Sequence, residues 1–190
     1  MTEEILEATG RPDVERDRYD VLTLTFHWVT ALLVVVLFGT SLVWNTWPRD
    51  RSLRPFMESM HVSLGILFAV LFIARLAWRF TGARNLPAEA GLSGLLSRIM
   101  YVFLYLLIAL EAGLGFVLRW VQGEQFMFFG LFSVPNPIGE NRAFEHPIED
   151  LHNWVAWLII ALAAGHAAAA LFHHYVVKDR VLERMLFHRQ

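Results

Sequence analysis

Two histidines lie fourteen residues apart in an apolar stretch that runs from Glu149 to Tyr175. In an α-helix this spacing brings the side chains of His152 and His166 to within about 40° of each other and separates them by about 21 Å along the axis. Ionisable residues at membrane depth are costly, so two on one stripe indicate a binding site for each. Small residues surround His166 (Ala163, Ala164, Gly165 and residues 167–170), and small residues allow close approach to the backbone. This pattern alone is equally consistent with two interpretations. The histidines could hold a planar cofactor, or they could form hydrogen bonds where two helices pack tightly.

The composition indicates an integral membrane protein. The chain of 190 residues is 56% hydrophobic, whereas a soluble domain is roughly 45–50% apolar. It contains no cysteine, which excludes disulfides, thiolate-ligated iron–sulfur clusters and covalently attached c-type haem. The eight histidines therefore remain as the main candidate metal ligands.

Four apolar runs are long enough to cross a bilayer as helices, and they predict an all-α, integral membrane four-helix bundle. We expect helices at about 20–44, 56–80, 95–118 and 149–175. They lie in one domain, 19–178, between a tail at 1–18 and a basic tail at 179–190. In the connection 119–148, the apolar segment 126–132 is too short to span, so we expect it at the interface or capping the bundle. We also expect Pro135, Pro137 and Pro147 to break regular structure there.

Four helices place both termini on one side of the membrane. Eleven of the sixteen lysines and arginines fall on that side and five on the other. The positive-inside rule therefore predicts that both termini are cytoplasmic.

This topology gives each histidine a depth. His61 and His152 both lie near the outer face, and His27 and His166 both lie toward the cytoplasmic face. Two pairs that each bridge two helices are what two bis-histidine haems require. A closed zinc site would need four ligands in one cluster, whereas these pairs are about 21 Å apart. A proton relay would need acidic partners, and the apolar stretches between the histidines offer few.

Several polar residues could serve these sites. Arg79 at the inner edge and Arg54 at the outer edge are best placed for haem propionates. His173 and Lys178 lie near the inner edge, where imidazole and ammonium donors could bind a quinone carbonyl or a haem propionate. An interfacial histidine without such a role is an equal alternative for His173, and His173 could also replace His166 as the partner of His27, although the depth of His166 matches His27 better. Glu111 is the one buried acid, and it either pairs across the bundle or carries protons. We expect no such role for His146, His174 and His188.

Three segments of the chain resemble the bacterial cytochrome b561 family. They are GHAAAALFHHY at 165–175, followed by Lys178, Asp179 and Leu182; MHVSLGI at 60–66; and FHW at 26–28. The resemblance covers nearly the whole chain from about Tyr19 to Met185. It implies a four-helix bundle of the bacterial inner membrane with two haems b, ligated at His27, His61, His152 and His166.

The family resemblance also implies electron exchange with ubiquinone, and one branch of the family is a superoxide oxidase. We therefore expect a di-haem oxidoreductase in contact with membrane lipid. It would transfer electrons between an outer-face donor and ubiquinone, most specifically by oxidising superoxide to dioxygen. No catalytic residue is assigned, and neither nucleic acid nor an obligate protein partner is expected. One alternative is an electron-transfer and anchor subunit of a membrane dehydrogenase or hydrogenase; another is a structural or transport bundle without cofactor.

Three outer-face arginines, Arg49, Arg51 and Arg54, fall within six residues and shortly precede His61. Clustered positive charge near a site can raise the association rate of a small anion such as superoxide. An ordinary loop end that binds lipid headgroups is an alternative reading of the same residues.

Overall fold

The computed structural model describes residues 18–46, 53–84, 86 and 91–187. These residues form four long helices: α2 (Val21–Thr46), α3 (Leu53–Thr81), α4 (Gly91–Gln122) and α5 (Arg142–Phe172). A π-helical turn, η1 (His173–Val177), continues α5, and a 3-10 turn, η2 (Glu183–Met185), follows it. Each of the four long helices contains a stretch long and apolar enough to cross a membrane. The predicted integral membrane four-helix fold is therefore confirmed.

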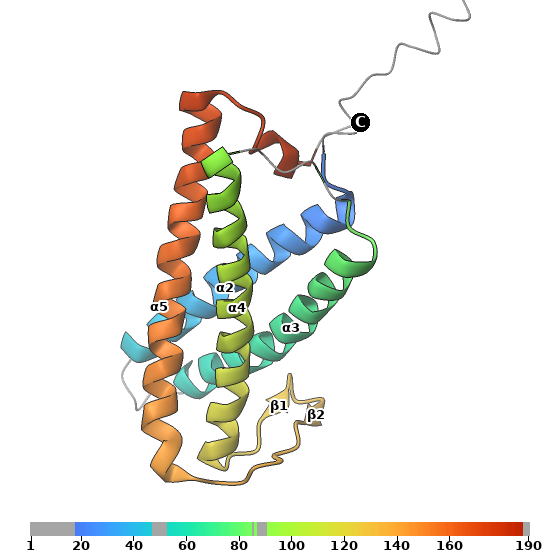
Figure 1. The fold of residues 1–190 in the computed structure, drawn as a ribbon. Helices are drawn as coiled ribbons and strands as arrows, with labels where there is room; N and C mark the ends of the chain where they lie inside the picture. The colour runs from blue at the N-terminus through green and yellow to red at the C-terminus, as the bar shows by residue number, and fades with distance from the viewer. Residues whose placement is uncertain (1–17, 47–52, 85, 87–90, 188–190) are drawn as a thin grey trace, which may run out of the picture.

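The helices pack as two pairs, α2 with α3 and α4 with α5, and contacts between the pairs are sparser. Figure 1 shows the two pairs crossing at an angle. Leu107, Val155 and Ile159 form a buried cluster between α4 and α5. Large apolar side chains such as Val70 and Leu106 are instead more than half exposed, as expected where lipid covers the surface.

The last spanning helix begins earlier than the sequence indicated. α5 starts at Arg142 rather than at residue 149, and Pro147 lies inside it. The prediction that Pro147 breaks regular structure is therefore wrong. A proline inside a helix removes one backbone hydrogen bond, and the following apolar turns, which pack against α4, keep the helix intact. α4 is also longer than predicted, since it covers Gly91–Gln122.

A small hairpin closes one end of the bundle, called here the hairpin end. Strand β1 (Met127–Phe128) pairs in antiparallel register with β2 (Phe132–Ser133), and the hairpin lies beside the end of α4 in Figure 1. The hydroxyl of Ser63 on α3 donates to the carbonyl of Met127 at 3.2 Å and accepts from the amide of Phe129 at 3.0 Å. Ser63 is 1% exposed, so these two bonds pin the hairpin to the bundle.

The opposite end, called the terminal end, holds residue 18 and the C-terminal segment. Asp20 caps α2 by accepting hydrogen bonds from the amide and hydroxyl of Thr23, and it also accepts from Trp78 Nε1 and the amide of Arg84. One carboxylate therefore joins the start of α2 to the end of α3. At the same end, Trp28 Nε1 donates to the carbonyl of Met185, which holds the C-terminal segment against α2.

Candidate cofactor sites

The four histidines of the predicted pairs meet across the helices. His61 on α3 faces His152 on α5 with ring centroids 6.5 Å apart and ring planes at 83°. His27 on α2 faces His166 on α5 with ring centroids 6.4 Å apart and ring planes at 63°. The first pair lies toward the hairpin end and the second toward the terminal end. Each pair bridges two helices, in the combinations that the depth argument expected.

The spacing within each pair fits two imidazoles on opposite sides of one metal ion. With metal–nitrogen bonds of about 2.0 Å, the ring centroids of two such ligands lie about 6.3 Å apart. Within the described ranges, no group of three or more histidine, cysteine or acidic side chains could hold a metal ion. Each pair thus offers two ligands, and a porphyrin, which supplies four nitrogens of its own, suits such a pair.

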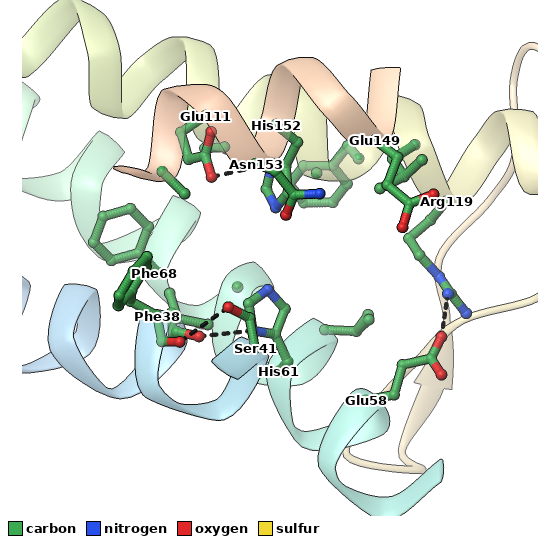
Figure 2. Close-up of a pocket in the computed structure, with 18 of the residues that line it drawn as sticks. Phe38, Ser41, Glu58, His61, Phe68, Glu111, Arg119, Glu149, His152 and Asn153 are labelled. Atoms are coloured by element: carbon green, nitrogen blue, oxygen red, sulfur yellow. Dashed lines mark hydrogen bonds and ion pairs between the residues drawn. The ribbon is translucent and has the colours of Figure 1, made fainter. Parts of the chain in front are cut away.

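A cavity of about 380 Å³ surrounds the hairpin-side pair. Figure 2 shows His61 and His152 on opposite walls of this space. All four long helices contribute to its lining, and much of the wall is aromatic or branched aliphatic, including Phe38, Phe68 and Ile159. An apolar slot with a few convergent polar groups is what a planar cofactor requires.

The ring of His61 is oriented by the backbone of α2. His61 Nδ1 lies 3.0 Å from the carbonyl oxygen of Leu37 and 3.0 Å from Thr40 Oγ1. A carbonyl oxygen only accepts hydrogen bonds, so the ring carries its proton on Nδ1. Nε2 is then left unprotonated and free to bind a metal.

The ring of His152 has a different neighbour. Nδ1 of His152 lies 3.2 Å from Oε1 of Glu111 on α4, and both side chains are mostly buried. The sequence left two roles open for Glu111, and the structure shows it paired across the bundle. One turn further along α4, Gly115 faces the same ring, since a Cβ at Gly115 would lie 3.5 Å from His152 Cε1.

The rim of the cavity carries charges of both signs. The lining includes Arg54, which the sequence indicated for this end, and also Arg119, Glu58, Glu145 and Glu149. Arg119 is already paired, because its guanidinium lies 2.7 Å from Glu58 Oε1 and 2.7 Å from an oxygen of Glu124. The other two arginines of the predicted cluster, Arg49 and Arg51, lie outside the described residues.

The terminal-side pair has an arginine beside it that sequence reasoning did not single out. Arg75 Nη2 lies 3.4 Å from His27 Nδ1, and its Nε donates to the hydroxyl of Tyr105 at 2.9 Å. Its spacing from His61 is fourteen residues, the same spacing that separates His152 from His166. This repeated fourteen-residue spacing, now on α3, was the signal in the sequence that could have identified Arg75. His166 itself is exposed, unlike His61 and His152.

The remaining predicted contacts lie at the terminal end. Arg79 is half-buried in the last turn of α3. His173 opens η1, and its Nδ1 contacts the carboxylate of Asp179. The hydrogen bond with His173 holds the pKa of Asp179 below its ordinary value. Lys178 is exposed and has a left-handed backbone, with φ 60°.

The histidines without an expected role lie apart from the two pairs. His146 is exposed, and its Nδ1 lies 3.8 Å from Glu149. His174 packs its ring edge-on against Tyr175. His188 lies outside the described residues.

Comparison with known proteins gives a consistent result along most of the chain. The family described as prokaryotic cytochrome b561 matches residues 18–188. Cytochrome b561 homolog 2 of Escherichia coli (strain K12) is 30% identical over 172 residues, which cover 90% of this chain and 92% of the relative. Cytochrome b561 homolog 1 of the same strain is 28% identical, with 92% of this chain and 99% of the relative covered. The probable superoxide oxidase CybB of Yersinia pestis is 28% identical, with coverage of 89% and 96%.

These matches agree with the four helices that are long and apolar enough to span a membrane. The resemblance seen in the sequence is confirmed, and the chain is a multi-pass membrane protein of electron transfer. It belongs to the prokaryotic cytochrome b561 family, which binds haem b.

Proposed function

We propose that this protein is a di-haem cytochrome b of the bacterial inner membrane that transfers electrons between a donor at the hairpin end and ubiquinone at the terminal end. The observation that carries the proposal is the near-equal spacing of the two histidine pairs, 6.5 and 6.4 Å between ring centroids. One such pair would suit a single haem, and the second pair, on the same helix α5, adds a second site about 21 Å away. Both termini lie on the cytoplasmic side in this arrangement, as the positive-inside rule predicts.

The chain itself would bind the haems, orient the histidine rings that hold them and surround one haem with apolar side chains. Haem b, when bound, accepts and releases one electron at a time. His61 and His152 would hold one haem and His27 and His166 the other, each through an unprotonated ring nitrogen. The backbone carbonyl of Leu37 fixes the ring of His61, and apolar side chains form much of the cavity wall around it. Arg54 lies in the lining of the hairpin-side cavity and would pair with a propionate there.

The donor that we propose is superoxide, with oxidation to dioxygen and reduction of ubiquinone. The name of the Yersinia pestis relative supports this reading, and so does the position of Arg54 at the rim of the cavity. For ubiquinone we propose the surface that carries Arg79, His173 and Lys178. These residues combine donors for the quinone carbonyls with the exposed apolar side chains of η1, which could contact its tail.

Purification of the whole chain in detergent provides the test. We expect two haems b per chain, a sharp reduced alpha band, and quinone reduction when superoxide is supplied to the purified protein. One haem or none would overturn the di-haem assignment. Two haems without quinone reduction by the purified chain would favour the electron-transfer and anchor subunit of a dehydrogenase or hydrogenase instead.

A further inference from the structure

The buried acid of α4 lies beside one proposed haem ligand. The side chains of Glu111 and His152 are 17% and 20% exposed, and Glu111 Oε1 lies 3.2 Å from His152 Nδ1. Figure 2 shows both side chains on the same wall of the hairpin-side cavity. The 3.2 Å contact between Glu111 Oε1 and His152 Nδ1 does not have full hydrogen-bond geometry, and among the described residues neither Glu111 Oε2 nor His152 Nδ1 has another hydrogen-bond partner. We propose that Glu111 is a positioning residue that orients His152 and lowers the reduction potential of the hairpin-side haem; this inference rests on the proposed function.

The chemistry of imidazole ligation supports this role. A histidine that binds iron through Nε2 carries its proton on Nδ1, and that N–H can only donate. An ionised carboxylate accepts a stronger hydrogen bond from such an N–H than a neutral carbonyl or hydroxyl oxygen does. Carboxylate–histidine–metal arrangements orient the ring and make the ligand more basic. A more basic ligand with a negative charge behind it favours the oxidised, more positive state of iron, so the reduction potential falls.

Two of the other three ligands, His61 and His27, have different partners, which makes the effect specific to one haem. His61 contacts a backbone carbonyl and a threonine hydroxyl, and both are neutral. His27 lies 3.4 Å from the guanidinium of Arg75, which is cationic. With Glu111 ionised, an anion would lie behind one pair and a cation beside the other, which would favour electron flow from the hairpin end toward the terminal end, the direction that the proposed function requires.

The test compares three variants of the haem-loaded protein by spectroelectrochemical redox titration. Glu111→Gln keeps the size of the side chain and removes its charge, and Glu111→Asp keeps the charge on a shorter stem. Asp150→Asn is the matched control, because Asp150 lies on the same helix as His152 but is exposed and lies outside the lining of the cavity. The terminal-side haem serves as an internal reference in every sample.

We expect Glu111→Gln to raise the midpoint potential of the hairpin-side haem alone, with a changed low-spin spectrum of that haem and two haems retained. Asp150→Asn should leave both potentials near their wild-type values. Two haems with unchanged potentials in Glu111→Gln would overturn the inference and leave the di-haem assignment intact. If Glu111→Gln loses the hairpin-side haem, retention of that haem in Glu111→Asp supports the need for a carboxylate, whereas its loss from both variants would show that Glu111 only fills space. Absence of haem from the wild-type chain would instead overturn the proposed function.

Discussion

His27 and His166 face each other from α2 and α5 with ring centroids 6.4 Å apart, within 0.1 Å of the 6.5 Å between His61 and His152. Each pair joins two different helices, so each of the four histidines can be tested by its own substitution. We expect His27→Ala or His166→Ala to lose the terminal-side haem, and His61→Ala or His152→Ala to lose the hairpin-side haem. The haem-to-protein ratio should fall from two to one in each variant, as measured by pyridine haemochrome assay. Two six-coordinate haems in any of the four variants would contradict the ligand assignment.

The angles between the ring planes predict the magnetic spectrum of the oxidised protein. Near-perpendicular imidazole planes leave the ferric d orbitals close in energy, which gives strongly anisotropic low-spin signals with a large principal g value. The planes meet at 83° for His61–His152 and at 63° for His27–His166. We therefore expect two such signals in electron paramagnetic resonance, with the larger g value from the hairpin-side haem. Loss of that signal in His152→Ala would assign it, and rhombic signals typical of parallel planes would contradict this geometry.

The charges at the rim of the hairpin-side cavity predict a salt dependence. If Arg54 attracts superoxide, the rate of haem reduction by superoxide should fall as salt rises, because charges are screened over about 8–10 Å at physiological ionic strength. Arg54→Glu should lower that rate at low salt by roughly ten-fold and flatten its salt slope. Stopped-flow absorbance at the reduced alpha band measures both quantities.

A matched control for Arg54 lies at the same end of the bundle. Arg142 is exposed and its Nε lies 2.6 Å from Glu140, away from the cavity lining, so Arg142→Glu should leave the superoxide rate nearly unchanged. A neutral chemical reductant should reduce both variants at the wild-type rate. Equal superoxide rates for Arg54→Glu and the wild type at low salt would show that Arg54 does not attract superoxide to this site.

We expect His173, whose ring contacts Asp179, to bind the quinone. His173→Ala should slow the oxidation of the reduced haems by added quinone by about two- to ten-fold, the equivalent of one hydrogen bond of about 0.5–1.5 kcal/mol. Asp179→Asn should produce a smaller change in the same direction, because it loosens the ring of His173 without removing it. His174→Ala is the neighbouring control, since His174 packs against Tyr175 instead. Unchanged rates in His173→Ala, with both haems intact, would remove this histidine from the site.

The carboxylate of Asp20 predicts a stability effect outside the membrane spans. Partial burial raises its pKa, but hydrogen bonds from Thr23, the Arg84 amide and Trp78 outweigh this effect and lower the pKa from 3.8 to about 2. Its folded-state pKa lies below the unfolded value, so its contribution is complete above about pH 4 and is lost as the pH falls toward 2. We expect Asp20→Ala to destabilise the protein by about 1–2 kcal/mol at pH 7, as the loss of a helix cap does.

Thermal unfolding followed by tryptophan fluorescence measures this stability in detergent. The difference between Asp20→Ala and the wild type should shrink as the pH is lowered from about 4 toward 2. Asp150→Asn, at an exposed position of α5, should behave like the wild type throughout. A constant difference between Asp20→Ala and the wild type across this pH range would show that the capping bond does not depend on the charge.

The sequence alone determined the membrane class, the four helices and the pairing of the histidines. These features follow from run length and helical spacing, which act along one element at a time: lipid leaves backbone groups no partner outside the helix, and fourteen residues return to nearly one face. Because these rules describe one apolar run at a time, the sequence placed the start of α5 at residue 149, later than in the structure. The apolar pattern ends near residue 149, whereas the hydrogen bonds of the helix continue back to Arg142 through Pro147.

Only the tertiary structure decided which polar groups contact the histidine rings. The contact of Glu111 with His152, of Arg75 with His27, and of the Leu37 carbonyl with His61 each join two different helices. The azimuth of one helix relative to another is set by side-chain packing between them, and the spacing within either helix carries no information about it. The hairpin at residues 127–133 is a similar case, because the buried hydroxyl of Ser63 on a distant helix holds it in place.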